Sequence, residues 1–251
     1  MLVMGILNVT PDSFADGGKH NDYESAVARG LEMISEGVDI IDIGGESTRP
    51  GADRVSEEEE IARTIPVIKE LAKHGVKISI DTMRASTARA AINAGASIIN
   101  DVSGGLADAS MLQTAAELKV PYIAMHWRGQ SKDMNSKAIY GDVVKDVISE
   151  LQERIDAALD AGISSDNLII DPGLGFAKDA DHNWAIIDAI DQFVAMDYPV
   201  LVGASRKRFL GGETPDEREQ ATIDLTKRLG GTGVWAVRVH SVKPHKEVLS
   251  I

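Results

Sequence analysis

The stretch "VDIIDIGGESTRPGA", residues 38–52, joins a short apolar run to a loop that is dense in hydrogen-bonding groups. The run up to Ile43 is typical of a buried strand that ends in a glycine pair. Glu46, Ser47, Thr48 and Arg49 then stand between that pair and a Pro-Gly. A chain that leaves a strand needs only a turn, so this loop indicates a function beyond reversing the chain.

The same alternation of a short apolar run and a longer segment extends along the whole chain. The longer segments have helical period. The predicted strands are Leu2–Val9, Asp39–Gly44, Lys77–Asp81, Ser97–Val102, Pro121–Trp127, Asn167–Asp171, Pro199–Ala204 and Val234–Val242. The predicted helices begin near Tyr23, Ser56, Arg84, Asp108, Asp142, Ala180, Asp216 and Pro244. Eight such units in 251 residues predict an α/β protein, a (β/α)₈ TIM barrel with a single domain spanning 1–251. An open doubly wound sheet is the competing architecture.

The segment after residue 55 has the clearest helix signals. Ser56 and Glu59 have the spacing of a capping box, and Gly75 closes the segment. Pro66 lies inside it and predicts a kink. One apolar face is formed by Ile61, Ile65, Ile68 and Leu71.

Composition excludes several classes of protein. Lys plus Arg number 26 against 39 Asp plus Glu, a net charge of −13, which disfavours a nucleic-acid partner or an anionic membrane surface. The absence of cysteine excludes disulfides, thiolate zinc sites and a cysteine nucleophile. The N-terminal run has no basic leader and is too short to span a membrane, so we expect a cytoplasmic protein.

Polar side chains collect where the predicted strands end, whereas the loops that enter the strands carry few polar or ionisable side chains. In a barrel of this type the active site lies at the carboxyl ends of the strands, so this asymmetry indicates an enzyme. The polar residues at the strand ends are Asn8, Glu46 to Arg49, Asp81, Asn100, Asp101, His126, Asp171, Ser205, Arg206, Lys207, Arg238 and His240.

These strand-end residues sort by charge into two kinds of binding group. Arg49, Arg206, Lys207, Arg238 and His240 are cationic or can become so, which suits a phosphate or a pyrophosphate. The second kind is formed by Asp81, Asn100 and Asp171 on rigid strands. Because a carboxylate accepts two hydrogen bonds side by side, these residues match the donor edge of a planar nitrogen heterocycle.

Several residues have a plainer interpretation. For Asp101, which precedes Ser103-Gly104-Gly105, we prefer a role in forming the turn. Arg206 is equally explained by a surface ion pair, and His126 by packing with both ring nitrogens satisfied. Asp42 is expected to lie in a packed layer or to cap a neighbouring loop. Solvent-facing positions are expected for His20, His74, His182 and His245.

Familiar catalytic and nucleotide-binding signatures are absent. The glycines of Gly173-Leu174-Gly175 lack the third member of a dinucleotide loop, because Lys178 stands at its place. Lys207 likewise stands where a nucleophile elbow needs glycine. With no P-loop and no H-E-x-x-H motif either, the sequence gives no support for covalent nucleophilic catalysis.

Two long motifs resemble those of one known enzyme family. "NVTPDSFADGG" (8–18) and "GGESTRPGA" (44–52) are similar to the first and second strand signatures of the dihydropteroate synthases, which bind pterins. The motifs "SIDTMR", "NDVSGG", "DPGLGF", "GASRK" and "RVH" follow in the family's order, and the resemblance covers residues 1 to 245.

The resemblance implies an activity and a set of site residues. The family condenses 6-hydroxymethyl-7,8-dihydropterin diphosphate with 4-aminobenzoate and releases pyrophosphate, in a (β/α)₈ barrel that uses Mg²⁺ and is usually a homodimer. The implied pterin residues are Asp81, Asn100, Asp171, Lys207 and Met125. The implied diphosphate residues are Arg49, Arg238 and His240, with Asn8 on the magnesium. The loop residues implied near the aminobenzoate are Phe14, Asp16, Thr48 and Pro50.

The family mechanism implied by the resemblance is a dissociative substitution. The pterin methylene loses pyrophosphate first, and the weakly nucleophilic arylamine then attacks the cation. The implied catalytic residues are Arg238, His240, Lys207 and Asp81, which act by electrostatics and positioning. The loop at 44–52 would exclude water from the cation, and sulfonamides, as aminobenzoate mimics, are expected to compete.

Three features depart from the family pattern. Ser241 follows His240 where the family usually has Asp, and we expect a local effect only. The stretch 211–218 is short, and the last helix is a stub, which puts the usual dimer surface in doubt. Two alternatives to an active synthase stay open: a pterin barrel that binds methyltetrahydrofolate for methyl transfer, and a paralogue that binds pterin without turnover.

Overall fold

The computed structural model describes residues 1–10, 19–46, 55–130 and 134–250, and within them strands and helices alternate. The strands are β1 Leu2–Asn8, β2 Ile40–Gly44, β3 Lys77–Asp81, β4 Ile98–Asp101, β5 Tyr122–Met125, β6 Leu168–Asp171, β7 Leu201–Val202 and β8 Ala236–Val239. The helices are α1 Lys19–Ser35, α2 Glu57–Leu71, α3 Ala85–Ala94, α4 Met111–Leu118, α5 Val143–Asp160, α6 Ala180–Asp188, α7 Ile190–Val194, α8 Glu217–Leu229 and α9 Lys243–Leu249.

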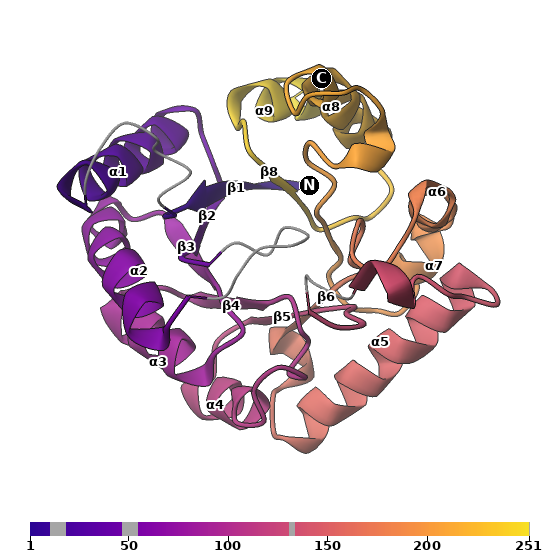
Figure 1. Cartoon of the computed structure of the whole chain (residues 1–251), viewed down its shortest axis with the longest axis horizontal. Coiled ribbons are helices and arrows are strands. Elements are labelled where there is room, and N and C mark those ends of the chain that lie inside the picture. Colours follow the sequence, from indigo (N-terminus) through magenta and orange to yellow (C-terminus); the bar gives the residue numbers. More distant parts are fainter. Residues whose placement is uncertain (11–18, 47–54, 131–133, 251) are drawn as a thin grey trace.

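All eight strands form one parallel sheet that curls into a barrel. The order β6-β5-β4-β3-β2-β1-β8-β7 follows the chain around the ring, which an open doubly wound sheet does not do. An isolated bridge between Ile170 and Val200 joins β6 to β7 and brings the ring nearly to closure. Figure 1 shows the helices as an outer ring around the strands. The predicted TIM barrel is therefore confirmed.

The helix signals in the sequence correspond to helix ends in the structure. Ser56 caps α2 by accepting a hydrogen bond from the backbone N–H of Glu59, and Asp142 caps α5 in the same way. One segment differs, because the helix expected from Ala180 is followed by the short helix α7. No helix in the described parts of the chain is long and apolar enough to cross a membrane.

The inside of the barrel is filled in layers that follow the period of two along each strand. An apolar layer lies toward the strand starts and takes one residue from each of seven strands, namely Met4, Ile40, Ile98, Ile123, Ile169, Leu201 and Ala236. Residues two further along each strand point to the same inner face. That next layer therefore contains Asp42, Asn100, Met125, Asp171 and Arg238, so the polar layer rests on an apolar floor.

Candidate active site

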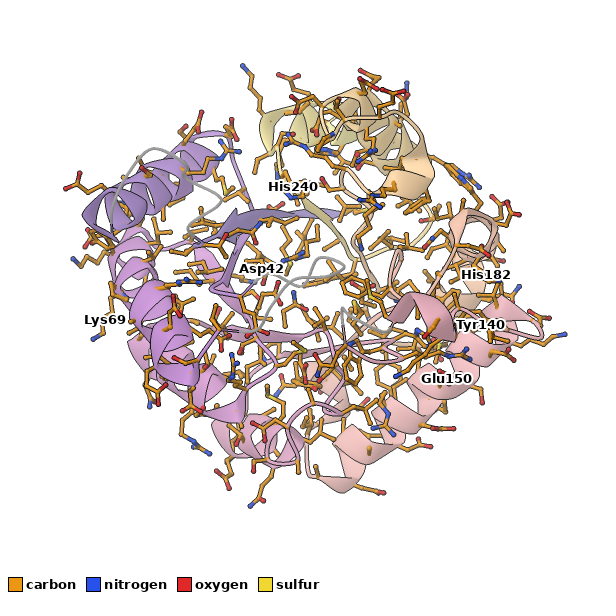
Figure 2. The ribbon with its side chains drawn as sticks, in the orientation of Figure 1. Asp42, Lys69, Tyr140, Glu150, His182 and His240 are labelled. Atoms are coloured by element: carbon orange, nitrogen blue, oxygen red, sulfur yellow. The ribbon has the colours of Figure 1, made fainter. Side chains whose placement is uncertain are left out.

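The centre of the site is an arginine held between two carboxylates. Arg238 on β8 donates from Nε to Asp42 Oδ2 at 2.6 Å and from Nη2 to Asp81 Oδ2 at 2.6 Å. Asn100 on β4 donates from Nδ2 to the same Asp42 oxygen at 3.0 Å. Three strands that are far apart in the sequence thus meet at one buried carboxylate, and Figure 2 shows Asp42 toward the middle of the ring of strands.

Burial and charge act against each other in this cluster. Burial raises the pKa of Asp81, and the neighbouring Arg238 opposes the rise. Burial also disfavours the charge on Arg238, but the carboxylates of Asp42 and Asp81 outweigh it and raise the pKa of the guanidinium. The arginine therefore stays charged at any working pH, and the site keeps a fixed cation beside two carboxylates.

Asp171 and Lys207 form a second group, next to the first. Asp171 at the end of β6 accepts from the backbone N–H of Gly173 at 2.7 Å. Its carboxylate and the Arg238 side chain both lie against Gly203, since a Cβ there would meet Asp171 Oδ2 at 3.8 Å and Arg238 Cβ at 3.9 Å. Burial raises the pKa of Asp171, whereas burial lowers the pKa of Lys207 to about 8.

Lys207 is held against the loop that follows β6. Its ammonium donates to the carbonyl of Leu174 and lies 4.7 Å from the centroid of the Phe176 ring. A Cβ on Gly175 would come within 2.8 Å of Lys207 Cδ, so the loop backbone packs directly on the lysine stem. The sequence alone did not predict that Phe176 lies at the site. Its position directly after "DPGLG" was the only signal for it.

The remaining predicted residues of the described chain lie at the same end of the barrel. His240 meets Ser205, whose Oγ is 2.9 Å from His240 Nδ1. Met125 packs with Met83 and Val102 in a small apolar cluster. Asn8 is half-buried at the end of β1, opposite Gly44.

Glu46 belongs to a structural clamp. Its carboxylate accepts from Arg84 Nη1 at 2.9 Å, and Arg84 Nη2 donates to the carbonyl of Val55 at 2.6 Å. Arg84 thus ties together the two residues that flank segment 47–54. Five predicted site residues lie outside the described residues, namely Phe14, Asp16, Thr48, Arg49 and Pro50.

The plainer interpretations hold for Asp101, His126 and Arg206. Asp101 accepts from the backbone N–H groups of Ser103 and Gly105, as a turn-forming residue does. His126 is buried and bonded at both ring nitrogens. Arg206 pairs with Glu219 at 2.6 Å, away from the central cluster.

The solvent-facing position expected for His245 is wrong, and the one expected for His182 holds only in part. His245 is fully buried rather than solvent-facing, because α9 packs on α8 and Thr226 Oγ1 lies 2.8 Å from His245 Nδ1. His182 is only partly exposed, because its ring completes a reciprocal capping box with Asp179 at the start of α6. Asp42 lies in a packed layer, as expected, and that layer is the centre of the site, a position that the sequence did not indicate.

Comparisons with known proteins agree with this geometry. The sequence model of the family described as pterin binding enzyme matches residues 4–240. The dihydropteroate synthase of Mycobacterium leprae is 48% identical over 99% of the chain and 91% of that protein. The Xanthomonas albilineans dihydropteroate synthase structure with 4-aminobenzoic acid has a TM-score of 0.93 and 43% identity, over 99% of this chain and 90% of that one.

A second structure of the Xanthomonas albilineans dihydropteroate synthase, in complex with 7,8-dihydropteroate, has a TM-score of 0.90 and 40% identity, over 99% of this chain and 91% of that one. These similarities extend over nearly the full length of the chain, so the chain belongs to the dihydropteroate synthase family of pterin binding enzymes.

Proposed function

We propose that the chain condenses 6-hydroxymethyl-7,8-dihydropterin diphosphate with 4-aminobenzoate, giving 7,8-dihydropteroate and pyrophosphate in folate biosynthesis. The observation that carries the proposal is the inner layer of Asp81, Asn100, Asp171 and Arg238, which four different strands bring to one end of the barrel. The relatives of known structure with 4-aminobenzoic acid and with 7,8-dihydropteroate support it.

The pterin ring is assigned to the carboxylate side of the site. Asp81 and Asp171 accept hydrogen bonds from the amino and ring N–H groups, and Lys207 donates to the ring carbonyl. Asn100 takes its orientation from Asp42 at 3.0 Å. Met125, in its apolar cluster, supplies a surface for the face of the ring.

The diphosphate is assigned to Arg238 and His240, together with Arg49. A guanidinium that stays charged suits this role, since charge accumulates on the leaving group as its bond breaks. Dissociation of pyrophosphate then leaves a cation on the pterin methylene, which the arylamine nitrogen attacks. The arylamine is itself the nucleophile, and a general base is scarcely needed, because the amine becomes acidic as it forms the bond and releases its proton readily.

Magnesium is proposed beside the diphosphate, with Asn8 as its protein ligand. No group of three His, Cys, Asp or Glu side chains in the described residues is arranged to hold a metal ion. A single amide oxygen at the end of β1 still fits Mg²⁺, which keeps several waters and binds mainly through substrate phosphates. When bound there, magnesium would neutralise charge on the leaving group.

The aminobenzoate is assigned to the residues of the first two loops. Phe14, Asp16, Thr48 and Pro50 are proposed from their motifs alone. Sulfonamides are expected to compete for this site, and an enzyme insensitive to them would contradict the roles of Phe14 and Pro50.

Release of pyrophosphate tests the proposed reaction. Purified protein is given the pterin diphosphate and Mg²⁺, with and without 4-aminobenzoate. Release that rises with 4-aminobenzoate and yields 7,8-dihydropteroate is expected. Pterin binding without turnover would indicate the inactive paralogue, and no pterin binding would overturn the assignment. No observation favours the methyl-transfer alternative.

Variants separate the roles of the pterin and diphosphate residues. Asp81→Ala and Lys207→Ala should abolish pterin binding, whereas Arg238→Ala should lower turnover more than pterin affinity. The matched control is Lys145→Ala, because the Lys145 side chain on α5 is 81% exposed and pairs with Asp142 at the start of its own helix. Unimpaired turnover of any of the three site variants would contradict the role of that residue.

We also propose a cytoplasmic homodimer. The metabolic role and the absence of cysteine support the compartment, and the usual state of the family supports the dimer. Light scattering on the purified protein measures the mass directly, and a monomer at all concentrations would contradict the dimer.

A further inference from the structure

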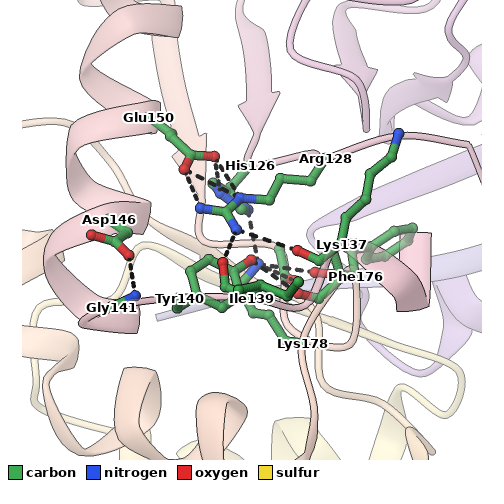
Figure 3. Close-up of polar contacts among 12 residues, drawn as sticks. His126, Arg128, Lys137, Ile139, Tyr140, Gly141, Asp146, Glu150, Phe176 and Lys178 are labelled. Carbon is green, nitrogen blue, oxygen red and sulfur yellow. Dashed lines mark hydrogen bonds and ion pairs between the residues drawn. The ribbon is translucent and has the colours of Figure 1, made fainter. Parts of the chain in front are cut away.

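A buried lysine lies behind the loop 172–177, on the side away from Asp171 and Lys207. Lys178 is 7% exposed, and its ammonium donates to the carbonyls of Gly173 and Phe176 at 3.1 Å each. Its third contact is with His126 Nδ1 at 2.8 Å (Figure 3). An ammonium has three donors, so all three are used, and every acceptor is neutral.

A chain of side chains connects this lysine to helix α5. His126 Nε2 lies 3.0 Å from Glu150 Oε2, and Arg128 Nε donates to the same carboxylate oxygen at 2.9 Å (Figure 3). The Arg128 guanidinium stacks over the Tyr140 ring at 3.8 Å and donates to the carbonyl of Ile139 at 2.6 Å. His126 follows Met125, which points into the barrel, so its own side chain points outward toward the helices.

The loop is therefore held from both sides. On the barrel side, Asp171 Oδ1 accepts from Gly173 N–H and the Lys207 ammonium donates to Leu174. Gly173 has φ of 69°, and a Cβ there would lie 2.4 Å from the carbonyl oxygen of His126. The loop backbone fits between these groups. A displacement of the loop on the Lys178 side would therefore also move Gly173 and Leu174, which bond to Asp171 and Lys207.

Stability alone does not account for a lysine at this position. Burial lowers the pKa of Lys178 to about 7, which means that the surroundings disfavour its charge. A methionine has a similar length and carries no charge to desolvate, and replacing buried charges by apolar groups is often neutral or stabilising. What a methionine lacks is the ability to fix two loop carbonyls and an imidazole at defined distances.

We propose that Lys178, oriented by His126 and Glu150, is a positioning residue that fixes the loop 172–177 so that Asp171 and Lys207 are placed to bind the pterin ring. The inference rests on the proposed function, since it assigns the pterin to those two residues. Lys178 itself does not touch the substrate, because it contacts the loop from the rear.

Steady-state kinetics and pterin binding of Lys178→Met test this role. Loss of ground-state positioning should raise the KM for the pterin diphosphate and the Kd for the pterin about tenfold, while kcat falls less than about threefold. A purely structural role would lower the melting temperature and the amount of active enzyme without changing KM. The matched control is Lys145→Met on α5, which should leave all three values unchanged.

Glu150→Gln keeps the test decisive if Lys178→Met does not fold. Glu150 is 34% exposed, and two residues, His126 and Lys178, stand between it and the loop, so its variant should fold and raise the pterin KM by about threefold. An unchanged pterin KM in whichever of the two variants folds would overturn the positioning role. Wild-type turnover in the same assay tests the proposed reaction separately, since a wild-type enzyme without product would overturn that assignment instead.

Discussion

Two cations of the same barrel, the mostly buried Arg238 and the buried Lys178, are stabilised in opposite ways. Arg238 donates to the carboxylates of Asp42 and Asp81, each at 2.6 Å. Lys178 donates only to two carbonyls and to His126. Burial works against both charges, but the carboxylates raise the pKa of Arg238, whereas the pKa of Lys178 falls to about 7.

The difference shows that the groups around a cation in the protein interior determine which role the cation can take. Two carboxylates keep Arg238 charged, and an anionic leaving group can compete for a guanidinium of this kind. The acceptors that Lys178 contacts directly are neutral, and the nearby charge of Asp171 favours the ammonium without outweighing burial. We therefore place the contribution of Lys178 in the geometry of the backbone that it contacts. In the proposed roles, Arg238 binds the leaving group and Lys178 fixes the loop backbone.

The largest effect is expected for Arg238→Met, which leaves two buried carboxylates without their cation. Removing one partner of a buried pair costs about 3–5 kcal/mol of unfolding free energy, and we expect that range here. Burial already raises the pKa of Asp81, so protonation should recover part of the loss at about pH 5 compared with about pH 7. Urea denaturation at both pH values measures this, and a loss below about 1 kcal/mol would contradict the comparison.

Lys178 should show a stability effect that depends on pH. A lysine in the unfolded chain has a pKa of about 10.4, whereas burial lowers the pKa of Lys178 in the folded chain to about 7. Between these values the unfolded state binds more protons, so stability rises with pH. The stability of the wild type relative to Lys178→Met should therefore increase by up to about 1.4 kcal/mol per pH unit above about 7. A difference that stays flat between about pH 6 and 9 would contradict the lowered pKa of Lys178.

The pH dependence of pterin affinity should reflect the protonation of Lys207. Burial lowers the pKa of Lys207 to about 8, so its ammonium is present below that pH and is lost above it. Above about pH 8, affinity should fall at most about tenfold per pH unit. Lys207→Arg keeps the charge and should flatten the profile, which fluorescence titration of the pterin would measure after correction for the free ligand. An unchanged slope in this variant would exclude Lys207 as the titrating group.

The smallest effect is expected at Ser241. Its neighbour Arg206 is a third cation, partly exposed, with which the two cations above can be compared. Ser241 donates to Glu219, which pairs with the partly exposed Arg206. Because such pairs and hydrogen bonds contribute little, Ser241→Ala should cost about 1 kcal/mol or less and change turnover less than about twofold. A larger loss of turnover would mean that the contacts of Ser241, Glu219 and Arg206 support the site after all.

The residues that the sequence placed correctly are those that obey a local rule. Eight apolar runs with helical segments between them predicted the barrel, and Ser56 and Asp142 marked helix starts that the structure confirms. The strand ends also predicted that Asp81 and Arg238 would lie on one face, since carboxyl ends of parallel strands share one rim.

Other residues could not be placed, because their partners come from distant parts of the chain. Asp42 meets Arg238 across 196 positions, and no local pattern indicates that contact. His245 is buried because α9 packs against α8. His126 faces away from the site because it follows Met125, a period-of-two argument that depends on knowing where the strand begins.

The sequence by itself determined the class of fold, the end of the barrel that carries the site and the chemical types gathered there. These follow from periodicity and from residue type, which act over a few neighbouring positions. The tertiary structure alone decided which carboxylate meets which cation, and that Lys178 contacts the loop from behind. Those contacts depend on closing the ring of strands, because only closure brings β2, β3 and β8 around one centre and places α5 against the rear of the loop after β6.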